Sequence, residues 1–125
     1  MNQPFSGRYR ARCTKVVDGD TIDVVVDLGF HLTATMRIRL WGINTAEMKD
    51  KDPAMRKQAA EAKEFVLLRM PPNAGETWPL FLETLKDPDN FGRWLAKVWY
   101  KDPDGTEIML NDELITVGLA EAFRR

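Results

Sequence analysis

The feature that most constrains the fold is a regular alternation of apolar and polar side chains in the first third of the chain. It is cleanest from Leu32 to Leu40, where apolar residues occupy every second position and threonine or arginine stands between them. A period of two is typical of a β-strand with one buried face. The same alternation occurs from Tyr9 to Cys13 and from Ile22 to Val26, with a turn signal at Asp18-Gly19-Asp20. The sequence therefore predicts three consecutive antiparallel strands.

The remaining two thirds of the chain mix helix and strand signals. A helix is predicted to begin at Asp52-Pro53, an N-cap followed by proline, and to end near Arg69. Two strands follow: one contains Pro79, which indicates an edge strand, and one runs from Trp94 to Tyr100, with Trp94 on its apolar face. Asn111 is expected to cap a second helix.

This order of elements favours one small fold. Five short antiparallel strands with a helix after the third fit a closed β-barrel of the OB type, and an open antiparallel α+β sheet is the alternative. The 125 residues suffice for one domain. We expect it to span residues 8–125, after a loose tail at residues 1–7.

Charge and composition exclude several classes of protein. A net charge of −1 and a pI near 5.8 argue against a surface coated in positive charge. The single cysteine forms no internal disulfide, and no apolar run is long enough to span a membrane. We expect a monomer that does not associate with membranes. The first residues lack the apolar segment of a signal peptide. We therefore expect either a cytoplasmic protein, for which a phage or mobile element is a candidate source, or a protein whose leader was removed.

Oxygen-bearing side chains stand just before the predicted second strand and just after the predicted third strand. Asp18 and Asp20 precede the second strand, and Asn44, Thr45 and Glu47 follow the third. If these strands pair as a hairpin, the two groups meet at one end of the sheet. Carboxylate, amide and carbonyl oxygens are the ligands of hard cations such as Ca²⁺. With one histidine and one cysteine, a zinc site is not expected. The competing interpretation is that both segments only turn the chain.

Two arginines add a second kind of chemistry. Arg39 lies on the polar face of the third strand, and Arg93 begins a later strand after Phe91-Gly92. A cation beside arginines suits phosphoryl transfer, because both stabilise negative charge on the phosphate. Arginine also binds phosphate through a two-pronged fork. Glu47 is a candidate to orient or deprotonate a water molecule.

Taken in order, three motifs resemble those of the staphylococcal nuclease (thermonuclease) family. They are Val17-Asp18-Gly19-Asp20-Thr21, Arg39 followed by Asn44-Thr45-Ala46-Glu47, and Phe91-Gly92-Arg93 before a strand. The resemblance covers nearly the whole chain. It implies an OB-fold barrel with Ca²⁺-dependent, largely sequence-nonspecific nuclease activity on DNA and RNA that leaves 3′-phosphates.

The resemblance also implies a role for each motif residue. Asp20, the Thr45 carbonyl and Asn44 would hold Ca²⁺, and Asp18 would act through water. Glu47 would act on the attacking water, and Arg39 and Arg93 would bind the scissile phosphate. Asn90 and Phe91 stand where the family has a basic residue and a tyrosine near the nucleotide.

The chain departs from the family pattern at the metal loop. Asn44 stands where an aspartate is usual, which predicts weaker Ca²⁺ binding, and Ala46 replaces a proline. The family's further nucleotide contacts would come after Phe123, so we expect a weak grip on the substrate. These departures and the acidic pI motivate an alternative, a non-catalytic OB-fold module that binds nucleic acid or protein.

Overall fold

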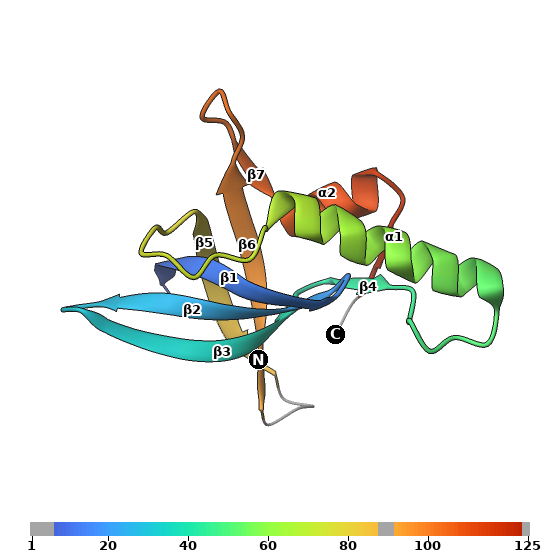
Figure 1. Ribbon diagram of the computed structural model, residues 1–125, viewed down its shortest axis with the longest axis horizontal. Helices are drawn as coiled ribbons and strands as arrows, with labels where there is room; N and C mark the ends of the chain where they lie inside the picture. Colours follow the sequence, from blue (N-terminus) through green and yellow to red (C-terminus); the bar gives the residue numbers. More distant parts are fainter. Residues whose placement is uncertain (1–6, 88–91, 124–125) are drawn as a thin grey trace.

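The computed structural model describes residues 7–87 and 92–123 (Figure 1). In this part of the chain the elements are β1 (Arg8–Asp18), β2 (Thr21–Gly29), β3 (Leu32–Leu40), β4 (Ile43–Thr45), α1 (Pro53–Arg69), β5 (Leu80–Lys86), β6 (Arg93–Lys101), β7 (Glu107–Met109), α2 (Leu110–Thr116) and β8 (Ala120–Ala122). Neither helix is long and apolar enough to cross a membrane.

Five of the strands close into a barrel. The order β3-β2-β1-β5-β6 is antiparallel at each step, and β3 then pairs with β6 in parallel from Arg37↔Arg93 to Leu40↔Ala96. This closure confirms the OB-type barrel and excludes the open sheet. The expectation of only antiparallel pairs is wrong at this one seam. An odd number of strands that alternate in direction must close with one parallel pair.

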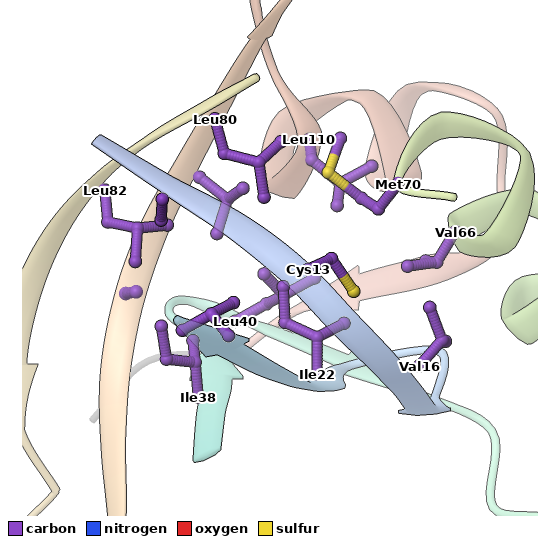
Figure 2. Packing of buried hydrophobic residues seen from close by; sticks show 14 of the residues in the cluster. Cys13, Val16, Ile22, Ile38, Leu40, Val66, Met70, Leu80, Leu82 and Leu110 are labelled. Carbon is purple, nitrogen blue, oxygen red and sulfur yellow. The ribbon is translucent and has the colours of Figure 1, made fainter. Parts of the chain in front are cut away.

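The alternating side chains of the strands fill the barrel. Figure 2 shows Val66, Met70 and Leu110 on the helix side of this core, facing Cys13 and Val16 of β1. Cys13 is 1% exposed, and burial raises the pKa of its thiol to about 11. The thiol therefore packs as a small apolar side chain at neutral pH.

Helix α1 begins and ends where the sequence predicts. Asp52 is its N-cap, with the side chain accepting a hydrogen bond from the backbone N–H of Ala54 at 3.0 Å. The buried stripe consists of Ala59, Ala62 and Val66. Small residues in this stripe let the helix lie close to the barrel.

Strand β5 is not an edge strand, contrary to the prediction from Pro79. It pairs with β1 on one side and with β6 on the other. Pro79 directly precedes Leu80, the first paired residue, so its missing N–H costs no ladder hydrogen bond. The prediction for Trp94 is also wrong, because its side chain is 38% exposed on the outside of the barrel.

Asn111 does not cap α2. It is 2% exposed, and its amide oxygen accepts from the Val98 N–H at 3.0 Å. Its amide nitrogen donates to the carbonyl oxygens of Trp41 at 2.9 Å and Ala96 at 3.0 Å. Asn111 therefore fastens α2 to the end of β3 and to β6. Helix α2 begins after Met109 with no side-chain cap.

A second, two-stranded sheet was not predicted. Strand β4 pairs antiparallel with β8, from Ile43↔Ala122 to Thr45↔Ala120. The backbone N–H of Phe123 continues the contact by donating to the carbonyl of Gly42 at 2.8 Å. The end of the described chain thus braces β4, which carries Asn44 and Thr45.

Candidate active site

One cavity of about 370 Å³ gathers the residues that the sequence singled out. Every predicted site residue in the described part of the chain lines it: Asp18, Asp20, Arg39, Asn44, Thr45, Glu47 and Arg93, together with Thr21, Ala46, Met48 and Lys49. Asn90 and Phe91 lie outside the described residues.

The turn between β1 and β2 places the two aspartates at this cavity. Asp18 pairs with Thr21, which leaves Gly19 and Asp20 as the loop. Gly19 is needed for space, because a Cβ atom there would lie 2.7 Å from the Cβ of Ala62 in α1 and 3.2 Å from the side chain of Thr45. The turn is therefore wedged between the helix and the Thr45 loop.

Asp20 is held at the centre of a hydrogen-bond network. It accepts from the Thr21 hydroxyl at 3.1 Å and from the Thr45 N–H at 3.4 Å, while its own N–H donates to Asp18 at 3.2 Å. Burial would raise the pKa of Asp20, but hydrogen bonding with Asp18 and the charge of Arg39 bring that pKa below its ordinary value.

The pKa of Asp18 shifts in the opposite direction. Burial, followed by its contact with the charged Asp20, raises the pKa of Asp18 to about 6. Two partly buried carboxylates side by side repel each other, so the site favours a positive charge between them, either a proton or a cation.

Arg39 is fixed by contacts on several sides. Its side chain is 10% exposed, and Nη2 donates to Asp20 Oδ2 at 3.4 Å, to the Ile43 carbonyl at 3.2 Å and to Asn44 Oδ1. The guanidinium also lies 5.7 Å from the ring centroid of Phe123. Arg39 is therefore pre-positioned, at little further entropy cost, for an anion in the cavity.

Arg93 reaches the cavity through the parallel seam of the barrel. It stands directly beside Arg37 of β3, at the first residue of β6. Its Nε and Nη2 donate to Asp87 Oδ2 at 3.1 and 3.0 Å, and Asp87 is 1% exposed. No local pattern in the sequence singles out Asp87, because its contact with Arg93 depends on the tertiary fold.

Glu47 and Lys49 lie on the exposed loop after β4, and both line the cavity. Glu47 was predicted from the sequence, but Lys49 was not. The sequence signal for Lys49 is a basic side chain two residues after Glu47, in the same predicted loop. Of the cavity-lining cations described, Arg39 and Arg93 pair with aspartates, whereas Lys49 forms no ion pair within residues 7–87 and 92–123.

The donor set suits a hard cation held weakly. Within the described residues no three His, Cys, Asp or Glu side chains converge as a metal cluster. The carboxylates that line the cavity are those of Asp18, Asp20 and Glu47, with neutral oxygens from Thr45 and Asn44 nearby. The amide oxygen of Asn44 already accepts from Arg39. Such all-oxygen donors fit Ca²⁺ better than a transition metal, with water completing the shell.

Fold and site together define a small OB-type barrel that carries acidic and arginine side chains in one cavity. The family model described as Staphylococcal nuclease homologue matches residues 37–125. The chain belongs to this family. The match begins at Arg37, so Asp18 and Asp20 precede it. No curated protein matches the chain.

Proposed function

We propose that this protein is a Ca²⁺-dependent nuclease that hydrolyses phosphodiester bonds of DNA or RNA with little sequence preference. The observation that carries the proposal is the meeting of Asp20, Arg39, Glu47 and Arg93 around one cavity, although they come from four separate segments. Membership of the nuclease family supports the same reaction class.

The two arginines are proposed to bind the scissile phosphate. Both line the cavity, and each is oriented by a carboxylate, Arg39 by Asp20 and Arg93 by Asp87. A guanidinium already held in place stabilises the extra negative charge of a pentavalent phosphate without reorganising. Removal of one such donor typically lowers kcat by about 10²- to 10³-fold.

The cation is proposed to sit at Asp20 and the Thr45 carbonyl, with Asn44 as a further ligand and Asp18 acting through water. When bound, Ca²⁺ would supply Lewis-acid polarisation of a phosphoryl oxygen. Since Asn44 is neutral and bonded to Arg39, we infer that Ca²⁺ binds more weakly than it would to an aspartate at that position.

Glu47 is proposed to orient the attacking water or accept its proton. Its position on an exposed loop at the cavity leaves it accessible to solvent. The water oxygen would bond to phosphorus as the bond to the 5′ oxygen breaks, and the leaving oxygen would take up a proton. The expected product is a 3′-phosphate.

The test is digestion of single-stranded DNA, double-stranded DNA and RNA in Ca²⁺ and in chelator. Glu47→Gln should lower the rate by about 10²- to 10⁴-fold. Glu61→Gln, on an exposed position of α1 away from the cavity, is the matched control and should cleave normally. Arg39→Ala should lose activity, whereas Arg37→Ala, whose arginine pairs with Asp23 outside the cavity, should not. Cleavage that survives chelator, or full activity in Glu47→Gln, would refute the mechanism.

One observation favours the alternative of a non-catalytic binding module. The Asn44 amide oxygen is engaged by Arg39, so the strongest departure from the family pattern falls on a proposed ligand. A binding module would retain nucleic acid or protein in chelator and would release no product. Affinity that falls steeply with salt would identify nucleic acid as its ligand.

A further inference from the structure

The hairpin of β2 and β3 extends beyond the barrel. Strand β1 pairs with β2 only as far as Val26, and β6 pairs with β3 only from Arg37 onward. Residues 27–36 are the projecting hairpin: residues 27–33 form a two-stranded ribbon, and residues 34–36 continue β3 beside the part of β2 that pairs with β1. In Figure 1 the hairpin points away from the rest of the molecule, on the side opposite α1. Isolated two-stranded hairpins are only marginally stable in water.

The tip of the projecting hairpin is apolar and exposed. Phe30 is 95% exposed, Leu32 is 59% exposed and Leu28 is 46% exposed. Phe30 and His31 both adopt positive φ angles, 55° and 59°, in a conformation that favours glycine or asparagine. A large apolar side chain placed in a strained turn, where water surrounds it, indicates a contact with something else.

One edge of the projecting hairpin is also open. In the described part of the chain, β3 has no second strand beside Leu32 to Met36. This stretch reads Leu-Thr-Ala-Thr-Met, with neither charge nor proline. Proteins usually protect a free strand edge with lysine, proline, a bulge or a covering segment. An unprotected edge is a template for strand addition.

We propose that two copies of this chain associate by antiparallel pairing of their β3 edges about Ala34. In this register Thr33 lies opposite Thr35 of the second copy, and Leu32 lies opposite Met36. These are favourable cross-strand pairs. The pairing ends at Leu32 and Met36, because the next residue of β3, Arg37, already pairs with Arg93 of β6. The surface is self-complementary, as a two-fold dimer requires.

The area available sets the strength of the dimer. At about 200 Å² for a fully exposed large side chain, Leu28, Phe30 and Leu32 expose roughly 400 Å² per copy. Leu32 lies within the paired stretch and Leu28 and Phe30 flank it, so two copies bring at most about 800 Å², to which the paired backbones add. Specific interfaces begin near 1,000 Å². The structure therefore favours a weak, concentration-dependent dimer over the monomer expected from the sequence.

Sedimentation equilibrium from low micromolar to near-millimolar protein tests the proposal. The wild type should rise from the monomer mass of 14.3 kDa toward twice that mass. Thr33→Lys/Thr35→Lys places like charges opposite each other and should weaken association by roughly tenfold or more. Thr33→Lys/Thr35→Glu, which also places a charged side chain at both positions, brings opposite charges together and should associate. Amide exchange at residues 32–36 should slow as wild-type concentration rises.

A third variant keeps the test decisive if either double variant unfolds. Phe30→Ser changes only the exposed tip and should weaken the dimer while leaving thermal unfolding of the monomer unchanged. A wild type that stays monomeric throughout, or two double variants that associate equally, would overturn the proposal. Phe30-dependent binding of a monomeric wild type to phosphatidylcholine vesicles would assign the tip to lipid and overturn it as well.

Discussion

Arg93 is held by a carboxylate that is shielded from water: both Nε and Nη2 donate to Asp87, whose side chain is 0% exposed. An arginine bound in this way keeps its fork in one orientation before any phosphate arrives. Asp87 itself does not line the cavity, so it acts by positioning Arg93.

Asp87→Asn should therefore lower nuclease activity, by up to about 10²-fold, because the guanidinium loses its orientation. A double-mutant cycle with Arg93→Ala should show a coupling of about 0.5–3 kcal/mol in the free energy of unfolding. Denaturant unfolding and steady-state kinetics measure the two effects. A coupling of zero would mean that the pair contributes nothing to the fold.

Lys49 should contribute to substrate binding more than to catalysis. As a cavity-lining cation without an ion pair among the described residues, it is available to a phosphate of the substrate. Lys49→Ala should raise KM and reduce the slope of log affinity against log salt by about one unit. Lys51→Ala, on the same exposed loop but away from the cavity, is the control and should change neither. Equal effects of both variants would indicate only a general loss of positive charge.

Asn44→Asp should strengthen Ca²⁺ binding. A third carboxylate beside Asp18 and Asp20 adds negative charge at the proposed ligand set, and affinity for Ca²⁺ rises with ligand charge. We expect at least an approximately tenfold lower Kd, about 1.4 kcal/mol, by isothermal titration calorimetry. Unchanged affinity would show that position 44 is not a ligand and serves Arg39 instead.

Gly19→Ala should destabilise the protein by about 1–3 kcal/mol, because the new methyl group would collide with Ala62 of α1. The helix or the turn must then move, and the turn carries Asp18 and Asp20. Gly7→Ala is the matched control, since a Cβ atom there meets nothing within 4 Å. Thermal unfolding compares the two variants, and a neutral Gly19→Ala would show that the packing of α1 adapts.

Tyr100 should contribute a stability that depends on pH. Burial and then the hydrogen bond that its hydroxyl donates to Glu113 Oε1, at 2.6 Å, raise the pKa of Tyr100 from 10.0 to about 12. The raised pKa stabilises the fold fully below pH 10, and this contribution is lost as the pH rises through 12. The stability difference between the wild type and Tyr100→Phe should follow that course.

The same pKa is open to direct measurement. The chain has two tyrosines, so Tyr9→Phe leaves Tyr100 as the only phenol. Its phenolate absorbance should then rise with a midpoint near pH 12. A midpoint near 10 would contradict the hydrogen bond with Glu113.

Local sequence signals determined much of this protein. The alternation from Leu32 to Leu40 predicted a strand whose last residues enter the core, and Asp52-Pro53 fixed the start of α1. The three motifs also named seven residues that line the cavity. These features depend on neighbours within a few positions, whose backbone preferences and side-chain periodicity are visible in the sequence.

Tertiary structure decided the rest, because the deciding contacts join distant segments. The direction of the β3–β6 seam follows from closing five strands, and it alone brings Arg93 to the cavity. The alternation along β6 predicted that Trp94 lies on the apolar face. Only the closed barrel shows that its side of the strand meets water. Asn111 has the chemistry of a helix cap, but its amide instead donates to the carbonyl of Trp41, directly after β3, and to that of Ala96 in β6. The buried Asp87 behind Arg93 could not be inferred from any local pattern, because burial is a property of the whole fold.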